Sequence, residues 1–172
     1  VASGGIGKRS RLGLFGSIRQ WITLSRRYFE VLLKDKLNLV ILFAQAPVIA
    51  MLTFFVLGEN LPRDLVYFVI ALVAVWFGTS VAAREIIRER PVYIRERMVN
   101  LGLIPYLASK LLVLAIIVSI QCLTLFVPLK LFDIIGLMPM PGDLGGIPQF
   151  WTMLVTGAVG IAIGLLISAI VK

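Results

Sequence analysis

The chain has 172 residues, of which 59% are apolar and only 15% are charged, and its mean hydropathy is +0.98. Soluble domains carry about 45–50% apolar and about 25% charged residues, so this composition excludes an ordinary soluble globular protein and indicates a membrane protein. The net charge is +8, but the basic residues are confined to a few segments between apolar stretches. This distribution favours contact with anionic membrane lipids and argues against a nucleic-acid partner.

The N-terminal part of the chain divides into two segments. Residues 1–13 are rich in Gly, Ser, Lys and Arg, and we expect a flexible basic leader there. Residues 14–36 place apolar side chains near one face of a helix and most basic side chains off it. The apolar set is Phe15, Ile18, Trp21, Ile22, Phe29 and Leu32, and the basic set is Arg19, Arg26, Lys34 and Lys36. The pattern predicts an amphipathic helix that lies in the membrane interface.

Four apolar stretches are long enough to cross about 30 Å of hydrocarbon as helices. They cover residues 37–57, 65–83, 111–129 and 150–171, and none contains Asp, Glu, Lys or Arg. Helix is the predicted structure because a lipid-exposed segment must satisfy its own backbone hydrogen bonds. The predicted fold class is therefore all-α, with a transmembrane domain over residues 37–172.

The distribution of basic residues predicts the orientation. All Lys and Arg residues except Arg63 and Lys130 lie in residues 1–36, in residues 84–110 or at Lys172. Because cytoplasmic segments of membrane proteins are enriched in Lys and Arg, we expect the N-terminus, residues 84–110 and the C-terminus to be cytoplasmic.

Residues 84–110, between the second and third spans, contain the most distinctive charge pattern. Acidic and basic residues alternate at helical spacing, and Pro91 interrupts them, so we expect a helical elbow. Apolar residues such as Val92 and Tyr93 lie among the charges. This mixture favours a docking surface, with a solvated linker as the alternative.

The same stretch carries a family resemblance. Ala83-Arg84-Glu85-Ile86, then Glu89-Arg90-Pro91-Val92-Tyr93-Ile94-Arg95-Glu96-Arg97, then Pro105-Tyr106 and Ser109-Lys110, resemble part of the permeases of G-type (White family) ABC transporters. The resembling part runs from the second transmembrane helix through the coupling helix to the third helix. Gln20-Trp21, Leu24, Ser25-Arg26-Arg27, Phe29, Leu32-Leu33 and Asp35 resemble that family's connecting helix. The resemblance covers about residues 15–171.

The resemblance implies the permease portion of an ATP-driven exporter for a hydrophobic or amphipathic substrate. A nucleotide-binding domain outside this chain would bind ATP and Mg²⁺, and a second permease half would complete a dimer. The resemblance implies that two sets of residues contact that domain. They are Arg26 and Arg27 in the connecting helix, and Arg84, Glu85, Arg88, Glu89, Arg90, Tyr93, Arg95 and Glu96 in the coupling elbow. The family has six spans, so we expect this chain to be a segment of a longer protein.

Three residues are candidates for the substrate pathway. Phe77 is at the family's position for a cavity aromatic, whereas Ala74 stands where some members have a polar cavity residue. Gln45 and Gln121 are mid-span amides, which are costly if unpaired, so they bond across helices or contact substrate. Gly157, Gly160 and Gly164 predict a smooth face for close helix packing.

Absent residue types limit the chemistry further. The chain has no His and one Cys, Cys122, so we expect no metal, no cofactor and no enzymatic activity of its own. The spans contain no charged relay and the sequence has no phosphate-binding loop, since Arg9 follows Gly7-Lys8. We expect an integral protein of a plasma or inner membrane. The alternative to a transport function is a membrane scaffold subunit that transports nothing and docks a cytoplasmic partner or anionic lipid.

Overall fold

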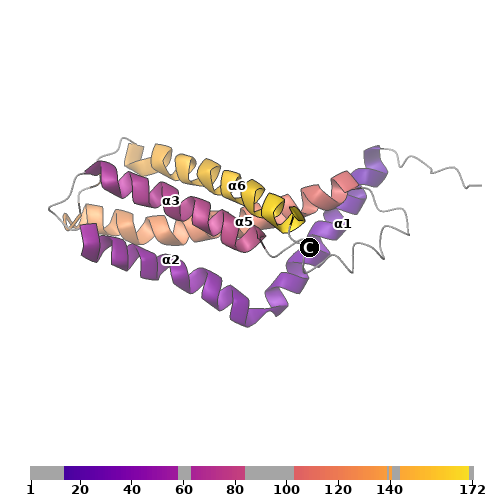
Figure 1. Cartoon of the computed structure of the whole chain (residues 1–172), viewed down its shortest axis with the longest axis horizontal. Helices are drawn as coiled ribbons and strands as arrows, with labels where there is room; N and C mark the ends of the chain where they lie inside the picture. Colours follow the sequence, from indigo (N-terminus) through magenta and orange to yellow (C-terminus); the bar gives the residue numbers. More distant parts are fainter. Residues whose placement is uncertain (1–13, 58–62, 84–102, 139, 141–143, 171–172) are drawn as a thin grey trace, which may run out of the picture.

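The computed structural model describes residues 14–57, 63–83, 103–138, 140 and 144–170, and all regular structure in these ranges is helical. The helices are α1 (Leu14–Lys34), α2 (Lys36–Leu57), α3 (Arg63–Ala82), α5 (Leu103–Ile134), the short 3-10 helix η1 (Leu144–Gly146) and α6 (Ile147–Ile170). In Figure 1, α2, α3, α5 and α6 form a bundle, and α1 extends beyond one end of it. The predicted all-helical class is confirmed for these residues.

Four of these helices are long and apolar enough to cross a membrane. Their candidate spans are Lys36–Val56, Leu65–Ala82, Tyr106–Ile134 and Ile147–Ile170. The first, second and fourth lie close to the spans predicted from the sequence. The described part of the chain therefore contains four candidate membrane-spanning helices.

Helix α5 is longer than the predicted third span at both ends. Its 32 residues correspond to about 48 Å, against about 30 Å of hydrocarbon. The prediction stopped at Lys110 and Lys130 because charges are costly in lipid. In the structure, Lys110 is buried against aromatic rings and Lys130 forms an ion pair with Asp133, so both charges are accommodated within the helix. Residues 103–110, which we expected in the elbow, are therefore the first turns of α5.

Asp35 separates α1 from α2. The backbone N–H of Asn38 donates to Asp35 Oδ1 at 3.4 Å, the position of an N-cap side chain at the start of a helix. The N–H of Leu39 also donates to the Asp35 carbonyl at 3.1 Å. The chain changes direction at this residue (Figure 1). The break lies one residue before the end of the segment 14–36 that was predicted as the amphipathic helix.

The closest helix pair is α3 and α6, which pack backbone against backbone. A Cβ atom on Gly78 would lie 2.3 Å from the Gly157 carbonyl oxygen, and one on Gly160 would lie 2.5 Å from the Val75 carbonyl oxygen. Real Cβ atoms do not approach this closely, so the contact requires glycine on both helices. The glycine face predicted on the last span is therefore a packing surface.

The bundle has a small apolar core and a largely apolar exterior. The core contains alanines and aliphatic side chains from all four helices, together with Phe77. Many large apolar side chains point outward, and the most exposed on α2 is Leu37, followed by Phe55. An exterior of this kind matches a lipid environment, in which association of helices depends on close packing and polar contacts.

Helix α5 ends at a glycine. Gly136 has a φ of +81°, which favours glycine, and its N–H donates to the Asp133 carbonyl at 3.0 Å. The N–H of Leu137 donates to the Phe132 carbonyl at 2.9 Å, completing a Schellman motif. Asp133 Oδ1 also accepts the N–H of Met140 at 2.7 Å, which fixes the chain beyond the helix.

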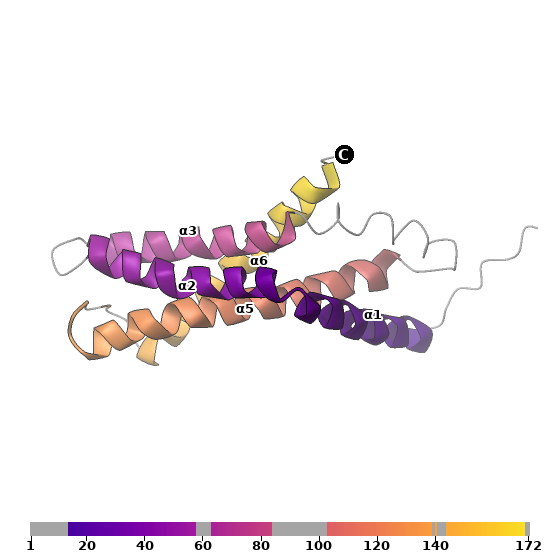
Figure 2. The same cartoon turned by 90° about the horizontal axis from the view of Figure 1, so that it is seen from below.

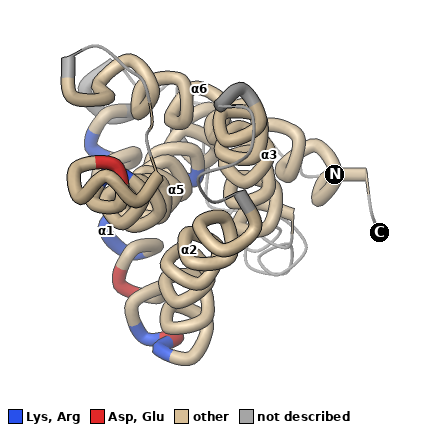
Figure 3. The backbone as a smooth tube through the Cα atoms, turned by 90° about the vertical axis from the view of Figure 1, so that its left-hand side faces the viewer, with Lys and Arg blue, Asp and Glu red and all other residues tan. Residues whose placement is uncertain are grey.

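Successive spans run in opposite directions, so α1, the end of α3, the start of α5 and the end of α6 all lie at one end of the bundle (Figure 1). We call this the α1 end, and the opposite one the distal end. Figure 3 shows charged residues along α1 and also on α5. The cytoplasmic location of the α1 end stays a prediction from the charge distribution.

Candidate functional site

The predicted coupling residues lie in a segment that joins two helices at the α1 end. Arg84, Glu85, Arg88, Glu89, Arg90, Tyr93, Arg95 and Glu96 lie outside the described residues. Helix α3 ends at Ala82 and α5 begins at Leu103, so the segment starts and finishes at the α1 end. The described part of the candidate site is therefore the surface formed by α1 and the first turns of α5.

Helix α1 presents three sectors. The first sector contacts α5 and contains the buried Ser25 and Tyr28 and the partly buried Leu32. The second is apolar but exposed, and consists of Ile18, Ile22, Phe29 and Leu33. The third is polar and exposed, and includes Arg19, Thr23, Arg26, Arg27 and Glu30. One sector thus packs on protein, one suits lipid and one suits water or a polar partner.

Arg26 and Arg27 both lie on the exposed polar sector. Arg26 Nε is 3.1 Å from Glu30 Oε1, one helical turn away. An exposed ion pair of this kind contributes about 0–1 kcal/mol to stability, so its structural value is small. Both side chains are exposed, and their contact with a nucleotide-binding domain stays a prediction.

Lys110 is the centre of the contact between α1 and α5. Its side chain is only 4% exposed, and its Nζ lies 3.4 Å from the centre of the Tyr28 ring and 5.8 Å from that of Tyr106. A cation over an aromatic face that is shielded from water contributes about 2 kcal/mol. Ser109, also buried, donates its hydroxyl to the Tyr106 carbonyl at 2.7 Å. Lys110 therefore attaches α5 to α1, whereas the Ser109 bond lies within α5.

Sequence reasoning did not single out Tyr28. Trp21, Ser25, Tyr28 and Leu32 are spaced at four, three and four residues, which places them on one helix face. The predicted apolar face combined Trp21 and Leu32 of this face with residues of the exposed apolar sector. The spacing of this second face was the signal that could have identified Tyr28.

Gln121 lies in the contact between α2 and α5, and Gln45 lies on α2. Gln121 is fully buried, and its Nε2 donates to the Leu42 carbonyl at 2.8 Å. Its Oε1 is buried without a hydrogen-bond partner, as is Nε2 of Gln45. The structure therefore assigns Gln121 a bond between helices, which was one of the two expected roles. A substrate contact for either amide stays a prediction.

Phe77 lies apart from the two amides, on α3. Its side chain and that of Ala74 are 0% exposed, and both belong to the apolar core between the helices. Phe77 therefore faces the interior of this chain in the described conformation. Its place in a substrate pathway, which the resemblance implies, stays a prediction.

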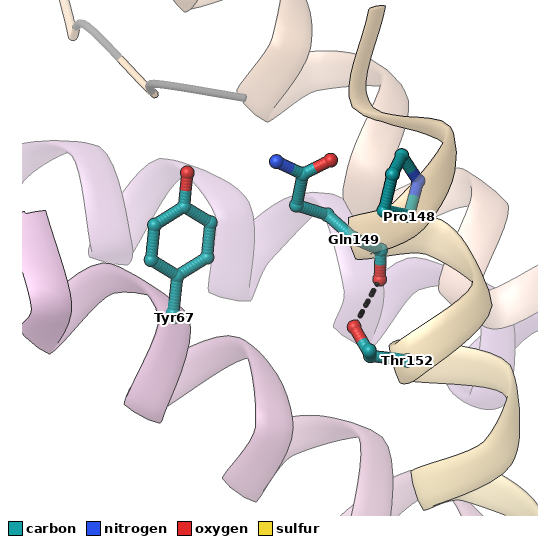
Figure 4. A pocket seen from close by; sticks show the side chains of 4 residues that line it. All are labelled: Tyr67, Pro148, Gln149 and Thr152. Atoms are coloured by element: carbon teal, nitrogen blue, oxygen red, sulfur yellow. Dashed lines mark hydrogen bonds between the residues drawn. The ribbon is translucent and has the colours of Figure 1, made fainter. Parts of the chain in front are cut away.

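A small open pocket lies at the distal end, between α3 and α6. Tyr67, Pro148, Gln149 and Thr152 line a volume of about 300 Å³, as Figure 4 shows. The Thr152 hydroxyl donates to the Gln149 carbonyl at 2.7 Å. The lining residues that the structure describes include no charged side chain and none of the predicted site residues.

The described residues contain no group of three or more His, Cys, Asp or Glu that could hold a metal ion.

Comparison with known proteins gives one finding: a family model described as ABC-2 type transporter matches residues 19–172. The match includes the four spanning helices and all but the first turn of α1. No curated protein and no solved structure matches the chain.

Proposed function

Since the chain belongs to the ABC-2 type transporter family, we propose that it is the permease portion of an ATP-driven ABC exporter that moves a hydrophobic or amphipathic substrate. The observation that carries this proposal is the family match over residues 19–172, a range that contains four helices able to cross a membrane. Membership of this family implies association with an ABC nucleotide-binding partner. That partner binds ATP and Mg²⁺ and hydrolyses the nucleotide, and this chain contributes no catalytic residue.

The charge distribution of the spans supports an external source of energy. Gradient-driven transporters usually place ionisable groups inside the membrane as an ion or proton relay. In the described spans, Asp, Glu, Lys and Arg occur only near helix ends, and the sequence contains no His. Energy therefore enters from a domain outside the bilayer.

The α1 end offers the surface on which such a domain can act. The polar sector of α1 carries Arg26 and Arg27, and the segment with Glu89 and Tyr93 begins and ends at the same end of the bundle. In the proposed transporter the nucleotide-binding domain rests on both. A second permease half pairs with this one, and ATP-driven approach of two such domains moves the halves relative to each other.

The predominantly apolar walls of the bundle support a substrate with little charge. Phe77, Gln45 and Gln121 combine an aromatic ring with uncharged amides, which suits a hydrophobic or amphipathic solute more than an ion. In the described conformation Phe77 and Gln121 are buried, so a pathway along them requires movement of the helices.

Substitutions in the elbow test the proposal. In the complete transporter, Glu89→Ala and Tyr93→Ala should each lower ATP-dependent efflux at least about tenfold while ATP hydrolysis continues, because they interrupt transmission rather than catalysis. The measurement is efflux of a lipophilic cationic dye, rhodamine 123, from proteoliposomes, alongside phosphate release. Val159→Ala, on the exposed face of α6 and away from this surface, is the control. Unchanged efflux per ATP in both elbow variants would contradict the proposal.

A further inference from the structure

The contact between α1 and α5 holds the only charged side chain that is buried in the described part of the chain. Lys110 belongs to α5, and the ring nearest its ammonium group, Tyr28, belongs to α1. Contacts between apolar side chains allow two helices to slide or rotate at little cost. A cation held over the face of a ring instead has a preferred position, so this pair fixes the register of the two helices.

The surroundings of the pair exclude water. Tyr28 packs with Val113 and Ile117 of α5, and Leu32 of α1 packs against the same cluster. Figures 1 and 2 both show α1 beside the first turns of α5. An ammonium group in such a place attracts a ring more strongly than one in water, because the surroundings screen the charge less.

The pair also lies on a continuous path from the polar surface to the distal end. Tyr28 directly follows the exposed Arg26 and Arg27 on α1. From Lys110, α5 continues as a single helix to Ile134 at the distal end of the bundle. A displacement applied to the polar sector of α1 can therefore reach the far side of the bundle through one side-chain contact and one helix.

We propose that Tyr28 and Lys110 are positioning residues that make α1 and α5 move as one body when the motor acts on α1. This inference rests on the proposed function and adds the route by which movement enters the spans. Tyr106 acts as the second wall around the ammonium group, at the greater distance of 5.8 Å.

A double-mutant cycle tests the contact itself. Tyr28→Leu and Lys110→Met should each raise the unfolding equilibrium constant in detergent, and the double variant should be no worse than the more damaging single variant. The expected coupling is about thirtyfold in that constant. Tyr28→Phe keeps the ring and Lys110→Arg keeps the charge, so both should stay close to the unsubstituted protein. Additive effects in the cycle would overturn the inference and leave the proposed function untouched.

A second experiment tests transmission in the complete transporter with its nucleotide-binding domains. Spin labels at Ile135 in the two halves, in a Cys122→Ala background, report the separation of the distal ends with and without ATP and vanadate. Tyr28→Leu and Lys110→Met should reduce the ATP-dependent change in separation at least about twofold while ATP hydrolysis persists. Tyr28→Phe and the exposed-sector control Phe29→Leu should retain it.

The outcomes separate the two claims. A full distal response in a folded Tyr28→Leu protein would overturn the inference alone. If the unsubstituted transporter shows no response to ATP, the proposed function fails and the inference fails with it. Where Lys110→Met does not accumulate as folded protein, the pair Tyr28→Leu and Tyr28→Phe carries the same test.

Discussion

Gln121 shows how one buried amide can hold two spans together. Its Nε2 donates to the Leu42 carbonyl of α2, in the part of α2 that precedes Pro47. Proline has no N–H, so the carbonyl that Pro47 leaves without a helical donor is that of Phe43, the residue after Leu42. The amide thus acts first as a structural link between α2 and α5.

Replacing Gln121 should therefore destabilise the chain more than replacing Gln45. Gln121→Leu removes the bond to Leu42 and should lower the free energy of unfolding by about 1 kcal/mol, a typical value for a polar contact between membrane helices. Gln45→Leu removes a buried Nε2 without a partner and should cause no loss. Unfolding in detergent measures both.

Ser119→Ala is the matched control, since the Ser119 hydroxyl bonds only to the Ala115 carbonyl of its own helix. If Gln121→Leu unfolds like the unsubstituted protein, the bond is not structural, and Gln121 becomes the stronger candidate for a substrate contact.

The sequence identifies which residues need partners better than it identifies the partners. Gln121 was predictable as a mid-span amide that requires a hydrogen bond, but Leu42 is 79 residues away and accepts through its backbone, which no side-chain pattern records. Lys110 is a similar case. Its ring partner Tyr28 depends on how α1 lies against α5, which local spacing does not determine.

At the scale of elements, α3 and α6 form the most closely packed pair. Gly78, Gly157, Gly160 and Gly164 remove side chains at the crossing, so the two backbones meet directly. Such contacts hold membrane helices together because burial of apolar surface provides little drive in lipid. The pair is therefore expected to behave as a rigid unit.

Gly160→Ala should disrupt this unit. The added Cβ would lie 2.5 Å from the Val75 carbonyl oxygen, and a backbone atom cannot rotate away, so the helices must separate. Overpacking of this kind typically costs about 1–3 kcal/mol, which thermal unfolding in detergent would detect. Ala158→Val, on the exposed face of the same helix, should leave stability unchanged. An equally stable Gly160→Ala protein would show that the helices do not meet as described.

Element boundaries were predictable where the cause is local. The first predicted span begins at residue 37, one residue after the observed start of α2, because the charged residues of the N-terminal part end at Lys36. The close face of α6 follows from the spacing of its glycines. The start of α5 at Leu103 does not follow from the sequence alone. A charge normally marks the end of a span, and Lys110 departs from that rule because tertiary contact with α1 shields it.

At the scale of the whole molecule, the alternating direction of the spans places α1 and the end of α6 at the same end of the bundle (Figure 1). The charge distribution predicts that this end is cytoplasmic. The number of crossings in the described residues could be predicted because each span is long and apolar. The packing of the four helices depends on contacts distant in sequence and needed the structure.

Labelling with a membrane-impermeant maleimide tests the orientation. In a Cys122→Ala background, Ile135→Cys at the distal end should react in intact cells. Thr23→Cys on α1 should react only after permeabilisation. Both side chains are exposed, so access to each depends on the side of the membrane. Labelling of Thr23→Cys in intact cells would reverse the predicted orientation and remove the surface proposed for the motor.

The central claim is that energy released by a cytoplasmic nucleotide-binding domain reaches both ends of this bundle. Its most direct test compares two spin-label distances between the paired halves of the reconstituted transporter, one at Thr23→Cys and one at Ile135→Cys, before and after trapping with ATP and vanadate. The account predicts opposite changes: the α1 ends approach each other and the distal ends separate. Distances that stay the same at both ends after trapping would contradict it.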